Sequence, residues 1–253
     1  MTTTIVTQTR AWKNLTTSSR KLLNEQFSLR QQFALDPSRG SKFLIKTPKI
    51  VMDYSRQLLN EEIIHHLIAL AEETNLKEKM EAMFNGQKIN ITENRAVLHT
   101  ALRNFSSNPV FVDGKDIMPS IRSVLEKVKT FSQRVHNGDF LGYTGKKIKN
   151  IVSIGIGGSY LGPEFLAEAC APYSVNGIRL FFVANVDGTD FARKTKDLNP
   201  EETLFIVVSK TFTTAETIKN AITAKEWILS KMGNDPSIIK KHFIAVSTNA
   251  KKV

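Results

Sequence analysis

The chain has 253 residues, more than one average domain and fewer than two, and its 41% hydrophobic and 23% charged residues exclude the composition of a disordered protein. The net charge of +11 favours anionic partners, but the basic residues are scattered in pairs among acids and lack the aromatic-interleaved motifs of RNA-binding proteins, which argues against nucleic acid. A small anionic substrate, together with a missing acidic remainder, would explain the positive charge more simply.

The first part of the chain, residues 1–145, is predicted to be mostly helical. Apolar residues recur at helical spacing over residues 61–73 and again over residues 117–135. The two stripes consist of Ile64, Leu67, Ile68 and Ala71, and of Ile117, Ile121, Val124, Leu125, Val128 and Phe131. Asn-Gly or Asp-Gly pairs at 85–86, 113–114 and 137–138 predict turns between the elements.

The remainder, residues 146–253, alternates short β-branched runs with helical patterns. The runs are residues 151–154, 178–183, 204–208 and 243–246. The clearest helix covers residues 215–231, where Ile218, Ala221, Ile222 and Ile228 share a face. This alternation predicts βαβ units, and hence an α/β fold with a parallel sheet and helices on both faces. Ligands of such sheets bind in the loops after the strands.

The first predicted strand runs into a glycine-rich loop, Gly155-Ile156-Gly157-Gly158-Ser159, which precedes a predicted helix over residues 160–169. Glycines allow the backbone to approach an anion closely, and the N–H groups at a helix start point toward it. Alternatively, the loop is a tight turn and Ser159 only caps the helix. We favour anion binding, because three glycines within four residues exceed what a turn needs.

Two nucleotide-binding motifs are ruled out in this loop. Tyr160 occupies the place of the third glycine in the dinucleotide pattern G-x-G-x-x-G, and Gly162 is followed by Pro163-Glu164, which does not fit the phosphate-loop pattern. The sequence therefore supports neither a nicotinamide cofactor nor a nucleoside triphosphate.

The third predicted strand runs into Ser209-Lys210-Thr211-Phe212-Thr213-Thr214, directly before the helix that begins at Ala215. Four hydroxyls and an ammonium at a helix start offer several charge-assisted donors, each worth about 1.5–3 kcal/mol to a charged group. The alternative is a capping box, since Thr213 and Glu216 have its spacing. Capping would explain Thr213 but not the other hydroxyls. Both loops follow strands of the sheet, so they can converge on one phosphate.

Other candidate sites are weaker. Residues 185–190 resemble a calcium loop only superficially, and a turn with a capping Asp187 is the better interpretation. His99 could be a catalytic base, yet a lone histidine on a helix is usually structural, and the same holds for Cys170.

Several segments resemble the glucose-6-phosphate isomerase family in order and spacing, over nearly the whole chain. They are residues 83–90 with Glu93, residues 95–103, 112–116 and 142–145, residues 154–159 with Leu161-Gly162-Pro163, residues 185–189, and residues 209–214 with Glu216-Thr217. Tyr160 and Ala215 depart from the aspartate and glutamine often found there, but neither change removes a hydroxyl or a glycine.

The resemblance implies that residues 1–145 form a helical N-terminal segment and that residues 146–253 form a first sugar isomerase (SIS) domain. This domain is a three-layer module with a parallel sheet, and it is incomplete here. It implies that Ser159, Ser209, Thr211 and Thr214 bind the phosphate, with Gly158 and Lys210 beside the sugar. The complete candidate set of substrate-binding residues is Gly158, Ser159, Ser209, Lys210, Thr211, Phe212, Thr213 and Thr214.

The implied activity is the interconversion of glucose 6-phosphate and fructose 6-phosphate through a cis-enediol, in glycolysis and gluconeogenesis. In the family, the glutamate base, the ring-opening histidine and lysine, and an arginine belong to segments beyond Val253, and the second SIS domain is absent here. The chain also stops soon after the fourth predicted strand, with no helix to cover it. We therefore expect a truncated chain that is inactive alone, with no catalytic residue of its own.

Two alternative functions are weighed against the isomerase. One is a non-catalytic regulatory module that binds sugar phosphates. The other is a nicotinamide-dependent dehydrogenase, which rests on fold analogy alone and is contradicted by Tyr160.

The compartment and the partners follow from a few further features. A single cysteine excludes an internal disulfide framework and favours a reducing compartment, and the histidines show no metal-ligand spacing with it. No apolar run approaches the roughly 18 residues that cross a bilayer, so we expect no membrane partner. The resemblance implies a cytoplasmic homodimer that needs no metal or organic cofactor.

Overall fold

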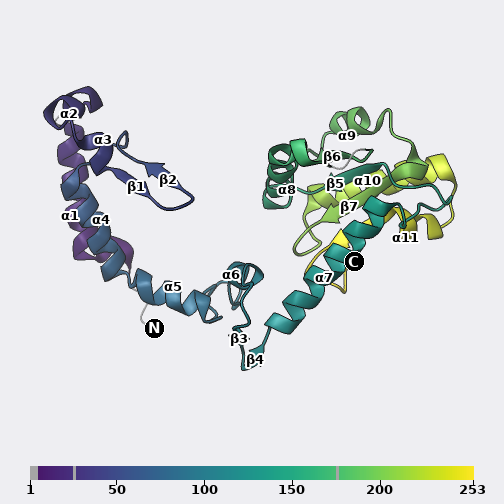
Figure 1. The fold of residues 1–253 in the computed structure, drawn as a ribbon, viewed down its shortest axis with the longest axis horizontal. Helices are drawn as coiled ribbons and strands as arrows, with labels where there is room; N and C mark the ends of the chain where they lie inside the picture. Colours follow the sequence, from purple (N-terminus) through teal and green to yellow (C-terminus); the bar gives the residue numbers. More distant parts are fainter. Residues whose placement is uncertain (1–4, 25–26, 175–176) are drawn as a thin grey trace. The chain divides into compact units, whose positions relative to one another are not determined.

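In a computed structural model, the chain forms two compact units, Met1–Ile121 and Arg122–Val253 (Figure 1). The structure describes residues 5–24, 27–174 and 177–253. The second unit carries the larger sheet and both candidate loops. No helix in these described ranges is long and apolar enough to cross a membrane.

The first unit is built from short helices and two antiparallel hairpins. Its elements are η1 (Val6–Gln8), α1 (Arg10–Asn24), α2 (Leu29–Leu35), α3 (Arg39–Lys42), β1 (Leu44–Lys46) paired with β2 (Val51–Asp53), α4 (Glu61–Glu73), α5 (Leu76–Phe84), α6 (His99–Leu102), and β3 (Phe111–Val112) paired with β4 (Lys115–Asp116). The helix expected over residues 61–73 is confirmed at both ends. The three predicted turns are also confirmed, since Gly86, Gly114 and Gly138 all have positive φ.

Helices α1 and α4 pack side by side in the first unit. Asn60 caps α4 by accepting a hydrogen bond from the Ile63 N–H at 2.9 Å. Ile63 is the buried residue of this helix, whereas Leu67 and Ile68, predicted to face a core, are 44% and 55% exposed. The predicted stripe is thus only partly correct, because α1 covers the neighbouring side of the helix, where Ser18 Oγ donates to Glu62.

Arg39 organises the connection between α3 and α4. Its guanidinium is buried and donates to the carbonyl oxygens of Ser55, Gln57 and Leu59 at 2.8–3.1 Å. It also lies 4.6 Å above the centre of the Phe43 ring. Together these contacts satisfy a buried cation with carbonyl groups and an aromatic face.

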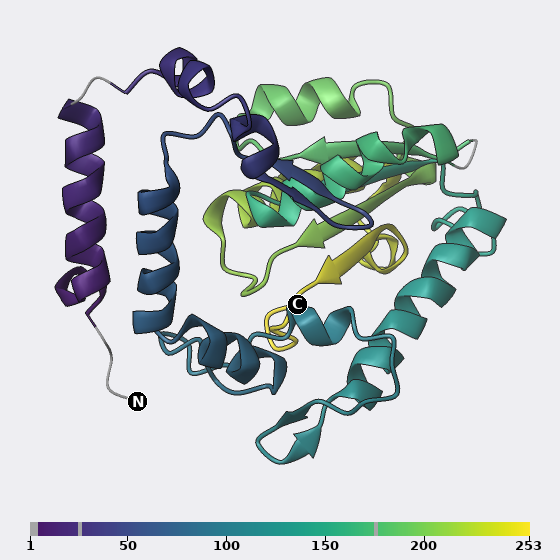
Figure 2. The same cartoon turned by 60° about the vertical axis from the view of Figure 1, so that its left-hand side comes forward.

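The second unit is a parallel sheet surrounded by helices (Figures 1 and 2). Its elements are α7 (Met118–Asn137, which begins in the first unit), β5 (Asn150–Ile154), α8 (Gly158–Ala169), η2 (Ala171–Tyr173), β6 (Arg179–Val183), α9 (Gly188–Thr195), η3 (Pro200–Glu202), β7 (Thr203–Val208), α10 (Ala215–Met232), α11 (Ser237–His242) and β8 (Phe243–Val246). The strand order is β6-β5-β7-β8, and every pair is parallel. The predicted α/β class and all four predicted strands are confirmed.

Each face of the sheet has its own hydrophobic cluster, because successive side chains of a strand point to opposite faces. On one face, Val152 and Phe205 pack with residues of α9, α10 and α11. On the other, Ile151 and Leu204 pack with Phe131 and Val135 of α7. The sheet therefore has helices on both faces, as the sequence predicts.

Two helices of this unit bury a face that differs from the predicted stripe. Only the last turns of α7 reach the sheet, so Phe131 packs there while Val124 and Val128 remain more than half exposed. In α10 the buried residues are Thr217, Asn220, Ala224 and Ile228, and Ile222 is 44% exposed. Polar side chains thus occupy part of the buried face, which apolar periodicity does not detect.

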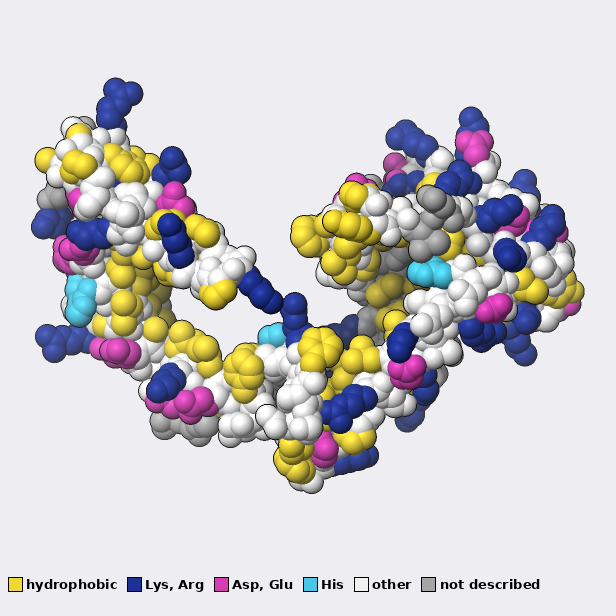
Figure 3. All heavy atoms as spheres, in the orientation of Figure 1, with side chains coloured by type: hydrophobic (Ala, Val, Ile, Leu, Met, Phe, Trp, Pro, Cys, Tyr) yellow, Lys and Arg dark blue, Asp and Glu magenta, His cyan; other side chains and the backbone are white. Residues whose placement is uncertain are grey.

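Helix α8 presents an apolar surface, and Figure 3 shows apolar side chains gathered over it. Leu161, Phe165 and Leu166 are each at least 60% exposed. Patches of exposed apolar side chains of this kind are typical of interaction surfaces.

Candidate functional site

The glycine-rich loop joins β5 to α8. Its backbone turns at Gly157, which has φ +55° and is the N-cap residue of α8. A Cβ on Gly155 would lie 2.8 Å from the Ser159 carbonyl oxygen, whereas a Cβ on Gly158 would meet no atom within 4 Å. Gly155 is therefore required for close packing within the loop, and Gly158 faces open space.

The second candidate loop, residues 209–214, joins β7 to α10 and collects the predicted hydroxyls. Ser209 is buried, with Oγ 3.4 Å from Thr214 Oγ1, and the hydroxyl oxygens of Thr211 and Thr213 are 2.6 Å apart. Phe212 has φ +54°, and its ring packs against the core of the sheet. A left-handed conformation is uncommon for a residue with a side chain, and it is often found at functional sites.

Both loops lie at the same edge of the sheet. Strands β5 and β7 are neighbours, and their register pairs Ile154 with Val207, so each chain leaves the sheet within two residues of that pair. The structure thus brings the predicted loops to adjacent strand ends, where open α/β sheets bind ligands.

The structure contradicts the two capping interpretations. Gly157, rather than Ser159, is the N-cap residue of α8, and no side chain caps this helix. The N-cap residue of α10 is Thr214, one position after the Thr213 of the supposed capping box, and its side chain makes no capping bond. Local capping therefore does not account for the hydroxyls of either loop.

The loop after β6 has a structural role. Asp187 caps α9 by accepting a hydrogen bond from the Thr189 N–H at 2.9 Å, as predicted, and this bond is the main reason that the pKa of its carboxyl is lowered. Asn220 of α10 donates to the Asn185 carbonyl oxygen and ties this loop to the helix. His99 and Cys170 are exposed and lie outside both candidate loops.

Sequence reasoning missed two features near the second loop. Residues 247–249, which follow β8, bond to its backbone, and their place after a strand at the same sheet edge could have identified them. The other is Thr217, whose buried hydroxyl is the one buried side-chain polar atom without a hydrogen-bond partner in the part of the chain that the structure describes. No sequence signal marks it.

A family model described as phosphoglucose isomerase matches residues 53–253. The chain belongs to the phosphoglucose isomerase family. A glucose-6-phosphate isomerase of Nitrosospira multiformis is 48% identical over 250 residues, which is 99% of this chain and 46% of that protein. The crystal structure of a glucose-6-phosphate isomerase from Chlamydia trachomatis superposes with a TM-score of 0.76 at 25% identity, over 97% of this chain and 45% of that one.

The family relationship is therefore supported by sequence and by fold. The chain spans about half the length of the relatives that it matches.

Proposed function

We propose that this chain supplies the sugar-phosphate-binding part of a glucose-6-phosphate isomerase, which interconverts glucose 6-phosphate and fructose 6-phosphate through a cis-enediol. The observation that carries the proposal is the hydroxyl-rich loop 209–214 at the carboxyl edge of the sheet, in a chain of the phosphoglucose isomerase family.

The chemistry of the two loops suits a phosphate. The hydroxyls of Ser209, Thr211 and Thr214 and the ammonium of Lys210 are donors, and a hydrogen bond to a charged group contributes about 1.5–3 kcal/mol. The loops also lead into the N-termini of α8 and α10, where the helix dipole favours an anion. Gly158, beside Ser159, leaves space for the ligand to approach the backbone. Phe212 and Thr213 complete the loop.

Turnover requires groups that these loops do not contain. None of the candidate residues carries a carboxylate or an imidazole that could remove the proton from the sugar carbon. We infer that the base, a glutamate by resemblance to the family, belongs to the further length that the relatives possess. Loss of a general base reduces a rate by about 10² to 10⁴. The chain by itself should therefore bind a phosphosugar without converting it.

The proposal also covers the domain organisation, the substrate class, the compartment and the oligomeric state. Residues 146–253 would form the first sugar isomerase domain, after a helical segment of residues 1–145. The substrate would be a sugar phosphate rather than a nucleic acid, and the enzyme a cytoplasmic glycolytic homodimer. The exposed apolar surface of α8 is a feature that favours association.

Calorimetric titration of residues 1–253 with glucose 6-phosphate, with a parallel turnover assay, tests the proposal. We expect binding without turnover, and no measurable binding after the paired change Ser209→Ala and Thr211→Ala. The matched control is the pair Thr223→Val and Ser230→Ala, because these hydroxyls of α10 donate only to carbonyls of their own helix.

Three results would count against the proposal. Full turnover by residues 1–253 would refute the inference about missing groups. Unchanged affinity in the Ser209 and Thr211 double variant would refute the phosphate site. Binding without turnover by the naturally produced protein would favour the regulatory module instead.

A further inference from the structure

The segment that follows β8 holds the backbone of the candidate phosphate loop. The Lys210 carbonyl oxygen accepts hydrogen bonds from Ser247 Oγ at 3.1 Å, from Thr248 Oγ1 at 2.8 Å and from the Thr248 N–H at 3.1 Å. The next carbonyl, that of Thr211, accepts one from Asn249 Nδ2 at 3.0 Å. Two consecutive carbonyls of the loop are thus bound by one short segment.

The chemistry of these bonds separates the hydroxyls of Ser247 and Thr248 from ligand-binding groups. A carbonyl oxygen can only accept, so both hydroxyls must donate their single proton to the Lys210 carbonyl. Ser247 Oγ also accepts from the Asn249 N–H at 3.0 Å. The hydroxyls therefore have only lone pairs left to present, and a phosphate needs donors instead.

The planar peptide unit links the direction of each bound carbonyl to the direction of the N–H group that follows it. Every described peptide bond in the loop is trans, so each N–H points opposite to the carbonyl of the preceding residue. Because the Lys210 carbonyl points to residues 247–249, the Thr211 N–H points away from them. The Thr211 carbonyl orients the Phe212 N–H in the same way, and this group closes the loop on the Ser209 carbonyl at 3.3 Å.

We propose that Ser247, Thr248 and Asn249 are positioning residues, a carbonyl clamp that holds loop 209–214 in its phosphate-binding shape. The inference rests on the proposed function of that loop. The clamp holds two carbonyl dipoles, which would repel an anion, on one side of the loop, and it thereby fixes the Thr211 N–H, which points to the other side. Donors that are oriented before binding need not be ordered by the ligand.

The conformation of the loop explains why a clamp is needed. Lys210, Thr211 and Thr213 are exposed, so packing of their side chains does not fix the backbone around them. Phe212 holds the loop to the core from within, but in a left-handed conformation that local preference disfavours. The Ser209 N–H bonds to the Val246 carbonyl at 3.1 Å, and the clamp continues this attachment along the loop.

The test uses the naturally produced protein with Thr248→Val, which removes one hydroxyl donor at nearly constant shape, and with Asn249→Ala. We expect the KM for glucose 6-phosphate to rise about 5- to 30-fold with kcat nearly unchanged, because the clamp acts on binding of the phosphate in substrate and transition state alike. Thr248→Ser should restore the KM. Thr223→Val is the matched control, since its hydroxyl also donates to a backbone carbonyl but within α10.

A second measurement needs no ligand. Amide hydrogen exchange at Ser209 and Phe212, whose N–H groups bond within this structure, should accelerate about 5- to 30-fold in Thr248→Val and not in Thr223→Val. Unchanged exchange together with an unchanged KM would overturn the clamp while leaving the phosphate site intact. Faster exchange in a protein whose unaltered form binds no phosphosugar would overturn the proposed function and, with it, the positioning role.

Discussion

His242 is fully buried at the end of α11, and each of its ring nitrogens has a backbone partner. Nδ1 lies 2.7 Å from the Thr203 carbonyl oxygen, and Nε2 accepts from the Tyr143 N–H at 2.9 Å. These partners require a neutral ring with its proton on Nδ1. Burial is the main cause that lowers the pKa of His242, while the Thr203 carbonyl and the Glu201 carboxylate act in the opposite direction.

This histidine should make the fold sensitive to mild acid. Its pKa in the unfolded chain is about 6.5, and the folded-state pKa is lower, so below pH 6.5 the unfolded chain binds the proton more readily. We expect the contribution to stability to be complete above pH 6.5 and to be lost as the pH falls toward the folded-state pKa. Urea unfolding at several pH values measures the effect.

His242→Gln should flatten that pH dependence, and His136→Gln, which changes an exposed histidine of α7, should retain it. An unaltered slope in His242→Gln would mean that other groups cause the acid sensitivity.

Gly155 and Gly158 of the glycine-rich loop differ in the space that they leave for a side chain. We expect Gly155→Ala to lower the free energy of unfolding by about 1–3 kcal/mol, because its Cβ would lie 2.8 Å from the Ser159 carbonyl oxygen. Gly158→Ala should change stability by less than about 0.5 kcal/mol. The same change should weaken phosphosugar binding about tenfold, since its methyl group would occupy the space in front of the loop.

Urea unfolding and calorimetric titration of both variants separate these effects. A Gly158→Ala variant that binds as tightly as the unaltered protein would place the ligand elsewhere.

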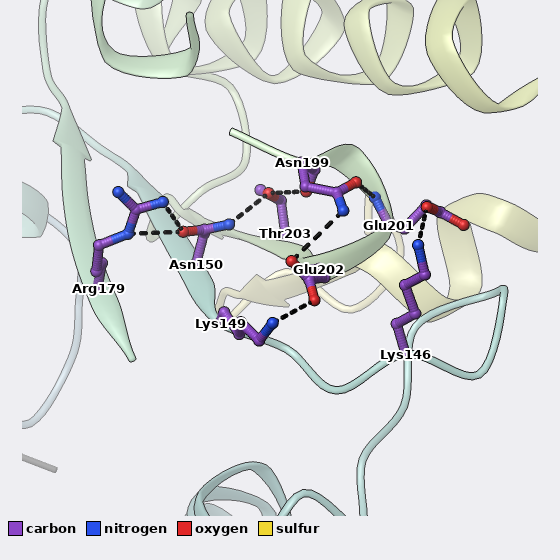
Figure 4. Close-up of polar contacts among 8 residues, drawn as sticks. All are labelled: Lys146, Lys149, Asn150, Arg179, Asn199, Glu201, Glu202 and Thr203. Carbon is purple, nitrogen blue, oxygen red and sulfur yellow. Dashed lines mark hydrogen bonds and ion pairs between the residues drawn. The ribbon is translucent and has the colours of Figure 1, made fainter. Parts of the chain in front are cut away.

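At the scale of elements, the amino-terminal edge of the sheet is held by a polar network, which Figure 4 shows. Asn150 is buried at the start of β5, and its register partners in the neighbouring strands are Arg179 and Thr203. Its Oδ1 accepts from Arg179 Nε and Nη2 at 3.1 and 2.8 Å, and the Thr203 hydroxyl donates to the Asn199 carbonyl oxygen at 2.7 Å. Asn150 Nδ2 donates to Thr203 Oγ1 at 3.4 Å, so this one side chain links the first residues of three strands.

Asn150→Ala should lower the free energy of unfolding by about 1.5–3 kcal/mol, because the buried Asn150 side chain accepts two partly buried hydrogen bonds from the charged Arg179 guanidinium. Lys149→Ala is the control from the adjacent residue. Lys149 bonds to Glu202 but is 59% exposed, so its loss should change stability by less than about 1 kcal/mol. Denaturant unfolding of both variants gives the comparison, and equal losses would show that the network does not hold the sheet edge.

At the scale of the whole molecule, the edges of the sheet have different tasks. The amino-terminal edge carries side chains that pair with one another and hold the register of the strands. The carboxyl edge carries the proposed phosphate site, where hydroxyls and helix N-termini come together. The separation follows from parallel strands, which present all their carboxyl ends, and the helices that follow them, on one side.

The sequence alone determined the elements whose signals are local. Helix α4 and the four parallel strands follow from the spacing and type of neighbouring residues, and the hydroxyl loop 209–214 is visible as a run of residues after a strand. The family resemblance also depended only on such segments.

Only the tertiary structure decided the features that depend on partners distant in the chain. Periodicity could not show that Thr217 and Asn220 lie on the buried face of α10, or that α7 reaches the sheet only through its last turns. Nor could it show that Asn249 bonds to the Thr211 carbonyl, since that bond joins two loops across the sheet edge. Burial and hydrogen bonding at these positions depend on which segments meet in space, and the local sequence does not predict those contacts.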